Sequence, residues 1–398
     1  MSGSELRIAI FSRYNLTEQY GLAAEFEEML KLLASRAKVF HISLRGPHNE
    51  AVIPPGVEVN ELPMLVDRAK PRDVALKFLL SYLLLPVAGA RLRKFKPHAI
   101  FVSEILPLMP LFLKVFVRTN VATAYGDWHI HNWLGRKTWA KPLLRLVEFL
   151  DRFESRRIDG FFCRAAAAGE RLKSWGVKPE SIRVVRDAPD PAAFYPRDES
   201  ELRRRCGFEE EDVVLLYHGV MHQGKGLDKL LTWTADLYRE NSRIAIILVG
   251  GGPEQEALRA LARKLQLGNR SVFAGWLKTI EQVGAYCNAA DICIAMRTAA
   301  EANDKVVPGA LLHSMACRKV VIGPALRGIC EIIEHGVNGY VFQPDDGDSF
   351  KQLVRALVAR RSQWEVIATR AYQDVQEKYS VKASAKQYAQ ALEHFASL

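Results

Sequence analysis

The chain has 398 residues, of which 49% are hydrophobic and 25% charged, with 26 Gly, 18 Pro and a formal net charge of +10 at pH 7. This ordinary globular composition excludes a collagen, a disordered chain and a small disulfide-stapled scaffold. The excess positive charge is uneven, because residues 1–190 hold 29 Lys and Arg against 20 Asp and Glu, whereas the remainder holds 26 against 25.

The length predicts two or three domains, each with its own core. The N-terminal sequence MSGSELRIAIF has no basic segment followed by a long apolar core, so we expect no signal peptide. No apolar run reaches the ~18–20 residues that span a bilayer. The six cysteines form no C-x-x-C pair, which is typical of reduced cysteines in a cytosolic protein.

The first half alternates short β-rich runs with longer amphipathic ones. Strands are predicted at 7–12, 37–44, 98–103, 121–125, 158–165 and 182–187, with helices at 21–35, 73–95, 106–117 and 138–156. Strands that are apolar throughout and joined by helices predict a parallel sheet covered on both faces.

An apolar stretch at 78–90 runs directly into Arg91, Arg93, Lys94 and Lys96. An apolar helix with a basic flank is typical of an element resting on an anionic membrane surface. The alternative is a buried core helix with a solvated basic end. Nucleic acid is not expected as a partner, because no aromatic-interleaved basic patch or zinc spacing is present.

The segment GDWHIHNW, residues 126–133, groups Asp127, His129 and His131 with two tryptophans. Two histidines two residues apart cannot share a helix face, and no third ligand motif is near, so no metal site is predicted. We favour a substrate-binding or acid–base role for Asp127 and His129. The alternative is a pair of surface histidines, with tryptophans that stack on a sugar ring or simply pack.

A segment rich in Pro and acidic residues, 187–201, is predicted to link two domains. Beyond it lie strands at 213–220, 243–251, 270–276, 291–296, 319–323 and 338–342, helices at 225–240, 253–266, 279–288, 308–317 and 347–361, and two closing helices at 363–378 and 382–397. The sequence therefore predicts an α/β protein with two doubly wound Rossmann-like domains, 1–190 and 191–381, facing each other across a cleft. Ligands of such sheets bind at the carboxyl ends of the strands.

Two glycine-containing loops follow predicted strands of the second half. In YHGVMHQGKGLDKLL (217–231), a strand runs through Gly219, His222 and Gly224 to a helix that opens near Lys225. Exposed N–H groups and the positive end of a helix dipole favour phosphate there. In VGGGPEQEAL (249–258), Gly251 and Gly252 permit close approach of a ligand to the backbone, or only a tight turn made for packing. The first strand carries no G-x-G-x-x-G, which argues against a classical nicotinamide dehydrogenase.

A longer polar loop joins the strand near 291–296 to the helix at 308–317. Asn303, Asp304 and Lys305 lie just before that helix, where backbone donors and a lysine suit a diphosphate, and Arg297 is a second candidate cation. Asp304 is alternatively only a helix cap. His313 is expected to face either the ligand cleft or the core. A fourth loop, within 323–342, is expected to be mostly scaffold.

The second half resembles the family four retaining glycosyltransferases, in a bacterial-type glycan-assembly branch. The matching strings occur in the family's order: AFYP, YHGVMHQGKGLDKLL, ILVGGGPEQEAL, VFAGWL, VGAYCNAADICIAM, PGALLHSMACRKVVIG and CEIIEHGVNGYVFQPDDGDSF. The resemblance implies the GT-B fold, with an acceptor-binding domain at 1–190 and a nucleotide-sugar-binding domain at 191–381. It also implies that the last helix, 382–398, packs back on the first domain.

Single residues carry the resemblance unevenly. The family's phosphate-binding lysine matches Lys225, but its partner arginine falls on Val220. The family's two glutamates fall on Lys305 and His313, so Lys305 is expected to grip phosphate and His313 to bind a ribose hydroxyl. The family's N-domain histidine falls near Tyr125–Gly126, which leaves Asp127 or His129 to replace it. The predicted catalytic residues are therefore Asp127, His129, Lys225 and Lys305, and the predicted donor-binding residues are Gly219, His222, Gly224, Gly251, Gly252, Trp276, Arg297, Asn303, Asp304, Val306 and His313.

The resemblance implies a glycosyltransferase that moves a sugar from a nucleoside-diphosphate sugar to a glycan, lipid-linked or small-molecule acceptor, with retention. No metal or other cofactor is expected, because helix N-termini and basic side chains neutralise the leaving diphosphate. Polysaccharide biosynthesis in the cytoplasm, with peripheral contact to the inner face of the cell membrane through the basic first domain, fits this activity. The alternatives are a non-catalytic GT-B relative that binds a nucleotide, glycan or partner enzyme, and a sugar-nucleotide epimerase.

Overall fold

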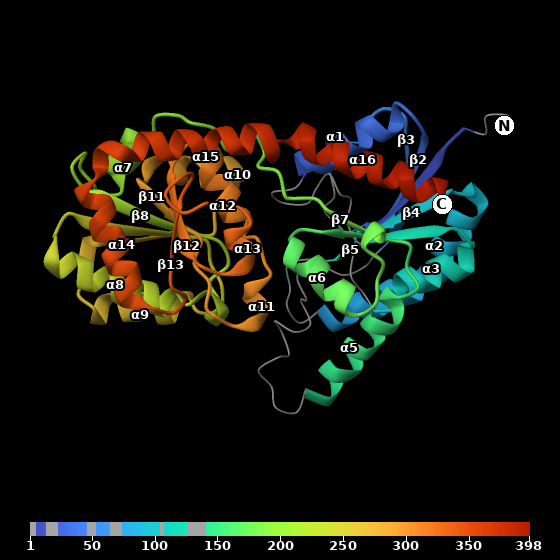
Figure 1. The fold of residues 1–398 in the computed structure, drawn as a ribbon, viewed down its shortest axis with the longest axis horizontal. Coiled ribbons are helices and arrows are strands. Elements are labelled where there is room, and N and C mark those ends of the chain that lie inside the picture. The colour runs from blue at the N-terminus through green and yellow to red at the C-terminus, as the bar shows by residue number, and fades with distance from the viewer. Residues whose placement is uncertain (1–4, 13–22, 46–52, 64–73, 104–106, 126–140) are drawn as a thin grey trace. The chain divides into compact units, whose positions relative to one another are not determined.

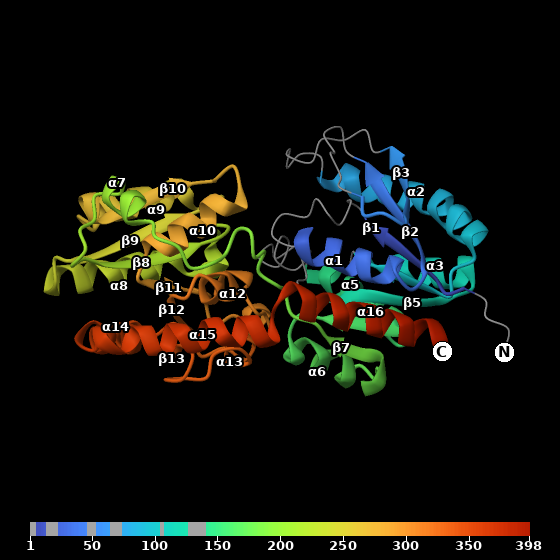
Figure 2. The same ribbon diagram turned by 90° about the horizontal axis from the view of Figure 1, so that it is seen from above.

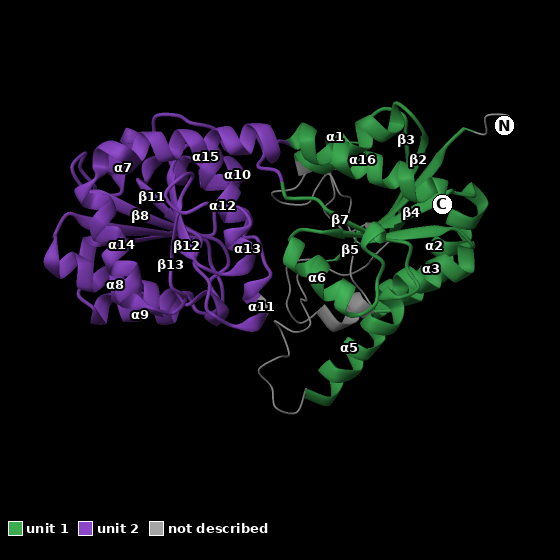
Figure 3. Cartoon of the chain, viewed as in Figure 1, with its two compact units in different colours: residues 1–187, 381–398 green, residues 188–380 purple. Residues whose placement is uncertain are grey.

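A computed structural model describes residues 5–12, 23–45, 53–63, 74–103, 107–125 and 141–398. The chain divides into two compact units (Figure 3): unit 1 is Met1–Asp187 with Val381–Leu398, and unit 2 is Ala188–Ser380. The predicted borders at 190/191 and 381/382 compare with observed borders at 187/188 and 380/381. Both units are α/β with parallel sheets, so the predicted fold class is confirmed.

Unit 1 is built on a seven-stranded parallel sheet with strand order β3-β2-β1-β4-β5-β6-β7 (Figure 1). Its strands are β1 (Arg7–Ser12), β2 (Lys38–Arg45), β3 (Val57–Pro63), β4 (Ala99–Val102), β5 (Asn120–Tyr125), β6 (Gly160–Cys163) and β7 (Ile182–Val184). The sequence analysis predicted strands from apolar runs and missed β3, VEVNELP, at the edge of the sheet. The partial alternation of polar and apolar residues in this segment was the available signal of a half-buried strand.

Helices cover both faces of this sheet. They are α1 (Ala23–Ala34), α2 (Val74–Phe95), α3 (Met109–Val117), α5 (Lys141–Ser155), α6 (Ala166–Ser174) and α16 (Val381–Ser397). Figure 1 shows α1 and α16 side by side on one face, with α2, α3 and α5 on the other. Tyr388 and Phe395 of α16 are fully buried among side chains of α1 and the central strands. The last helix of the chain is therefore part of the core of unit 1.

Unit 2 has a six-stranded parallel sheet with order β10-β9-β8-β11-β12-β13, which can be followed in Figure 2. Helices α10, α12 and α15 lie on one face and α8, α9 and α14 on the other. The strands are β8 (Val213–His218), β9 (Ile244–Val249), β10 (Ser271–Gly275), β11 (Ile292–Ile294), β12 (Val320–Pro324) and β13 (Tyr340–Phe342). The helices are α7 (Ser200–Arg205), α8 (Leu227–Glu240), α9 (Gln255–Lys264), α10 (Ile280–Ala289), α11 (Glu301–Asp304), α12 (Gly309–Ala316), α13 (Arg327–Cys330), α14 (Gly347–Ala359) and α15 (Trp364–Lys378).

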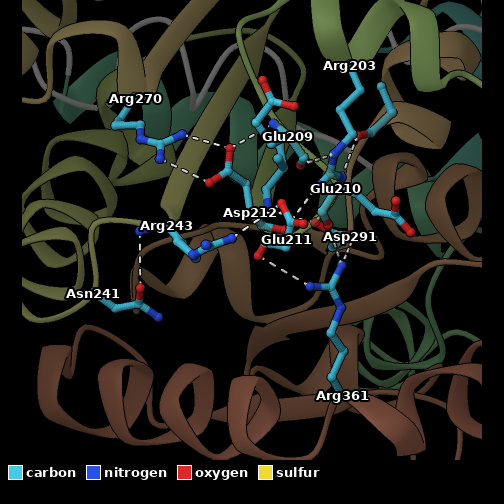
Figure 4. A network of polar contacts seen from close by, with 12 residues as sticks. Arg203, Glu209, Glu210, Glu211, Asp212, Asn241, Arg243, Arg270, Asp291 and Arg361 are labelled. Atoms are coloured by element: carbon cyan, nitrogen blue, oxygen red, sulfur yellow. Dashed lines mark hydrogen bonds and ion pairs between the residues drawn. The ribbon is translucent and has the colours of Figure 1, made fainter.

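A polar network clamps the amino-terminal edge of this sheet (Figure 4). Asp212, just before β8, accepts hydrogen bonds from the Arg270 guanidinium at 2.8 and 3.0 Å, where the chain enters β10. Asp291, just before β11, accepts from Arg203 at 3.0 Å and from the backbone N–H of Val214 at 2.8 Å. These contacts fix the strands at the edge opposite to their carboxyl ends.

Helix α2 combines the two alternatives that the sequence left open. Leu85, Ala88 and Leu92 are buried, but Leu79 and Leu83 are 55% and 62% exposed. The helix is therefore a core element on one side and an exposed apolar stripe on the other. Across the part of the chain that the structure describes, none of the helices has the length and apolar character needed to cross a membrane.

Candidate functional site

The candidate site is built on the carboxyl ends of β8, β9 and β11 in unit 2. The turns after β8 and β9 lie against each other, because Met221 donates its N–H to the Gly251 carbonyl at 2.8 Å. A Cβ added to Gly250 would lie 2.2 Å from the Gly219 carbonyl oxygen, and one added to Gly252 would lie 2.4 Å from that of Met221. Two glycines of the VGGG segment are therefore required by backbone packing, whatever ligand the turn holds.

The carbonyl oxygen of Gly224 holds the next two loops together. It accepts hydrogen bonds from the Thr298 backbone N–H at 3.2 Å, from Thr298 Oγ1 at 3.1 Å and from Asn303 Nδ2 at 2.9 Å. Asn303 is only 6% exposed, and its Oδ1 accepts from Arg297 Nη1 at 3.2 Å. Asn303 uses its amide on the protein, so here it positions the loops that carry Lys225 and Arg297.

Two cations stand at this edge of the sheet. Lys225 is half-buried in the one-turn helix Gln223–Lys225, and its charge contributes to lowering the pKa of His218, so the two side chains are close. Burial raises the pKa of Tyr217, and the nearby charge of Arg297 opposes that rise. The Tyr217 hydroxyl donates to the Val220 carbonyl at 3.0 Å. The guanidinium of Arg297 therefore lies near the turn where the family resemblance places an arginine and this chain has Val220.

Residues 304–306 continue the loop. Asp304 accepts from the backbone N–H of Arg327 at 3.0 Å and from its Nε at 2.5 Å, so it caps α13 from outside that helix. Burial opposes ionisation of Asp304, but these hydrogen bonds and the charge of Arg327 hold its pKa below the usual value. Lys305 is half-buried and 3.9 Å from Glu301, and Val306 is half-buried beside it.

Other predicted donor-binding residues occupy different surroundings. His222 Nδ1 accepts from the backbone N–H of Gly224 at 3.2 Å, so this ring shapes the turn that presents Lys225. Trp276 is 63% exposed after β10 and lies close to Gly251. His313 in α12 stacks on Phe194, with ring centroids 4.0 Å apart and an interplanar angle of 7°.

The sequence analysis missed His218, the last residue of β8. It is 9% exposed, and its ring is stacked with that of His313 at 5.5 Å and 13°. Burial lowers its pKa to about 4, so the imidazole is neutral at pH 7. The available signal was a histidine at the carboxyl end of a buried strand, where ligands of such sheets bind. The prediction instead placed the ligand on the glycines and the lysine that follow this strand.

Asp127 and His129 lie outside the described residues, so the structure does not place them. Within the described ranges, no three His, Cys, Asp or Glu side chains gather into a group that could hold a metal ion. The site in unit 2 combines neutral histidines, the cations Lys225 and Arg297 with Lys305 farther along the loop, and backbone N–H groups at the start of α12. This combination suits a phosphate-bearing ligand with hydroxyl groups.

Comparison with known proteins confirms the resemblance to glycosyltransferases. Residues 198–374, which lie within unit 2, match the family described as glycosyl transferases group 1. Sulfoquinovosyl transferase SQD2 of Arabidopsis thaliana is 27% identical over 77% of this chain and 59% of its own length. N-acetyl-alpha-D-glucosaminyl L-malate synthase of Bacillus anthracis is 26% identical over 53% of this chain and 54% of its own. The matches thus span less than two thirds of these relatives.

Solved structures share the fold over nearly the whole chain. Sucrose-phosphate synthase of Thermosynechococcus elongatus has a TM-score of 0.78 at 17% identity, covering 99% of this chain and 100% of its own. HepE of Anabaena, in complex with UDP-glucose, has a TM-score of 0.72 at 17% identity, covering 99% and 100%. At such identities the likeness supports the predicted GT-B fold and no more.

Proposed function

We propose that this chain, whose residues 198–374 match the group 1 glycosyl transferases, moves a sugar from a nucleoside-diphosphate sugar to a glycan, lipid-linked or small-molecule acceptor. The observation that carries the proposal is the Gly224 carbonyl, which joins the loop of Lys225 to the loop of Arg297 and Asn303. This arrangement holds two cations in a fixed relation beside the helix N-terminus of α12, as a diphosphate requires.

The chemistry follows from the charge that develops. As the bond between the anomeric carbon and the diphosphate oxygen breaks, negative charge grows on the leaving oxygen and positive charge on the sugar ring. Lys225, Arg297 and the α12 backbone N–H groups stabilise the leaving diphosphate, with Lys305 as a third cation. The acceptor hydroxyl forms the new bond to the anomeric carbon, and its proton passes to the leaving phosphate oxygen. Retention and independence from metal are part of this proposal, as are the substrate-side roles of Asp127 and His129.

Arg297 compensates for the arginine that the family resemblance places at Val220. Its guanidinium approaches the same turn from the end of β11, and Asn303 holds it at 3.2 Å. Because a guanidinium on either strand end can bind the same phosphate oxygens, the departure at Val220 does not require a loss of activity. Turnover of a sugar donor, rather than nucleotide binding, is what distinguishes our proposal from a non-catalytic relative.

The test is a screen of nucleotides and sugar donors with the wild type, followed by the same measurements on the variant Lys225→Ala. UDP, GDP, dTDP and ADP at millimolar concentration are tested for a rise in Tm, with UDP first because HepE was solved with UDP-glucose. Sugar transfer or donor hydrolysis is then followed by mass spectrometry. Lys225→Ala is expected to slow turnover by about 10²-fold, the size found for removal of one group that stabilises developing charge.

Lys229→Ala is the matched control, because Lys229 lies on the same segment but pairs with Asp345 at 3.0 Å. It should keep wild-type turnover. Binding without any transfer or hydrolysis would support the non-catalytic alternative. Conversion of the sugar nucleotide into another sugar nucleotide, with no acceptor present, would support an epimerase.

We also propose that unit 1 contacts an anionic membrane surface through the exposed sides of α2, α3 and α5, here called the three-helix face. Leu143, Leu146 and Phe149 of α5 are 43%, 53% and 63% exposed. A pocket of about 390 Å³ opens among the same helices. Its lining residues are Tyr82, Leu85, Pro86, Pro107, Leu108, Phe112 and Leu150.

The charge of this face favours lipid over a neutral partner. The exposed ions of α5 include Lys141, Arg145 and Arg152, while its Asp151 and Glu154 point inward and are 7% exposed. Its third carboxylate, Glu148, is 47% exposed and is paired with Arg171 at 2.9 Å. The α2 and α3 sequences contain no acidic residue. Exposed apolar side chains among basic ones are typical of a helix lying in the interface of an anionic bilayer.

Co-sedimentation with vesicles tests this contact. The chain should sediment with phosphatidylglycerol vesicles and much less with phosphatidylcholine, and the double variant Leu146→Glu, Phe149→Glu should stay in the supernatant. Val366→Glu is the matched control, because Val366 is 68% exposed on α15 of unit 2. Binding that is indifferent to lipid charge, or equal in the two variants, would contradict the proposal.

A further inference from the structure

His218 carries a buried nitrogen that the protein leaves without a partner. The ring is 9% exposed at the end of β8, and its Nε2 is buried with no hydrogen bond. A buried polar atom without a partner destabilises the folded state by about 1–3 kcal/mol. Such an atom beside a candidate ligand site therefore points to a group that arrives with the ligand.

The other ring nitrogen fixes what Nε2 can do. The His218 ring forms a hydrogen bond with the backbone of Ala310, at the start of α12, and this bond acts to raise the pKa of the ring. That effect is the one expected when a ring N–H donates to a carbonyl oxygen. Because Nε2 has no partner, Nδ1 is the donor in this bond. In a neutral imidazole the second nitrogen is then an acceptor. Nε2 therefore needs a hydrogen-bond donor, which a phosphate oxygen cannot supply at neutral pH.

The surroundings hold the ring neutral and in place. Phe194, His313 and His218 form a column of stacked rings, with centroids 4.0 and 5.5 Å apart. Burial and the charge of Lys225 both disfavour the imidazolium form of His218, and burial disfavours that of His313. Because burial and Lys225 outweigh the hydrogen bond to Ala310 and hold the pKa of His218 at about 4, the acceptor character of Nε2 persists through neutral pH.

We propose that His218 is a donor-specificity residue, whose Nε2 accepts a hydrogen bond from a hydroxyl group of the sugar nucleotide. The inference rests on the proposed function and deepens it. A hydroxyl is the ligand group that fits, because it donates to Nε2 while carrying no charge into the neutral column. His313 and Phe194 act as positioning residues, since their rings set the plane of the His218 ring.

The experiment compares two replacements of His218 in the full chain. His218→Asn keeps a donor where Nδ1 was, toward the Ala310 carbonyl, but has no atom at Nε2. His218→Gln places an amide oxygen near Nε2 and should restore binding. The matched control is His335→Asn, because His335 is exposed in the same unit. The Tm of each variant without ligand checks that it is folded.

Affinities are measured for whichever of UDP, GDP and ADP binds the wild type, for its 2′-deoxy and 3′-deoxy forms, and for the matching sugar nucleotide. His218→Asn should bind about tenfold more weakly, as expected for one lost hydrogen bond to a neutral acceptor. If a ribose hydroxyl is the donor, that loss is seen with the nucleoside diphosphate and disappears with one deoxy form. If a sugar hydroxyl is the donor, the loss is seen only with the sugar nucleotide.

Equal binding of all these ligands by His218→Asn and the wild type overturns the inference and leaves the proposed function standing, with a bound water then the partner of Nε2. If His218→Asn does not fold, weak binding by His218→Gln equal to that of His218→Leu overturns it instead. If no nucleotide binds the wild type, the proposed function and the inference fall together.

Discussion

At the scale of single residues, Asp212 shows how a buried charge is held. Its side chain is 3% exposed, and burial opposes ionisation. The hydrogen bonds from Arg270 and from the backbone N–H of Glu209 outweigh that effect and hold the pKa below its usual value. A carboxylate whose pKa is depressed in the folded state contributes stability above its unfolded pKa, and this is lost as the pH falls toward 3.

Asp212→Ala should therefore destabilise unit 2 by about 3 kcal/mol at pH 7, because it leaves Arg270 partly buried without its partner. The difference from wild type should shrink in acid, which urea titrations at pH 7 and below pH 3 can measure. Glu240→Ala is the control, since Glu240 and Arg355 form an exposed pair and little change is expected. An equal loss in both variants would contradict the role of burial.

The residue scale also explains which predicted ligands became scaffold. Asn303 and Asp304 have the residue types and the place in the chain of a phosphate-binding turn. In the structure Asn303 joins Gly224 to Thr298, and Asp304 caps α13. A side chain that makes several hydrogen bonds within the protein holds its loop more rigidly than one left free for ligand, and the sequence does not distinguish the two.

At the scale of elements, α5 has an unusual distribution of side chains. Its inner face carries Asp151 and Glu154, and Glu154 accepts from the N–H groups of Leu108 and Leu111 at the start of α3. Burial raises the pKa of Asp151 and of Glu154 to about 7. The folded state therefore binds protons more tightly than the unfolded chain, and unit 1 loses stability as the pH rises from about 4 through 7.

Asp151→Asn should remove much of this dependence. The variant is expected to be more stable than wild type at pH 8 and similar to it at pH 4, because the neutral amide avoids the unfavourable burial of charge. Thermal unfolding of both proteins at each pH gives the difference in stability between the variant and the wild type. The titration of other groups affects both proteins alike and cancels in this difference. A variant that is less stable than wild type at pH 8 would contradict this explanation.

At the scale of the whole molecule, the two units are not consecutive in sequence, because α16 returns to unit 1. Tyr388 contacts the rings of Phe26, Phe101 and Phe162, and Ser384 donates to the buried carboxylate of Glu25 at 2.8 Å. Gly160 lies so close to Phe395 that an added Cβ would be 2.4 Å from its ring. The C-terminal helix fills space in the core that no other described element fills.

Truncation after Ser380 should therefore unfold unit 1 and leave unit 2 folded. Calorimetry is expected to show the loss of one transition, and limited proteolysis should leave a resistant fragment near residues 188–380. The milder variant Tyr388→Ala should destabilise unit 1 by about 3–5 kcal/mol, the usual effect of removing a large buried aromatic ring. Two intact transitions after truncation would contradict the assignment of α16 to unit 1.

The sequence by itself determined most elements of both sheets, because apolar runs separated by amphipathic helices specify parallel strands that are buried on both faces. It also determined the place of Lys225, since a glycine turn between a strand and a helix is a local feature. It did not determine β3, whose pairing at the edge depends on β2, nor the inward direction of Asp151 and Glu154.

Only the tertiary structure decided which polar groups are satisfied within the protein and which are left for a ligand. Asn303 and His218 are both polar residues near strand ends. The amide of Asn303 makes hydrogen bonds to Gly224 and Thr298, whereas Nε2 of His218 has no hydrogen-bond partner within the protein. Those partners are up to 79 residues apart in the chain. Hydrogen-bond satisfaction depends on distances of about 3 Å between such segments, and local sequence patterns carry no record of them.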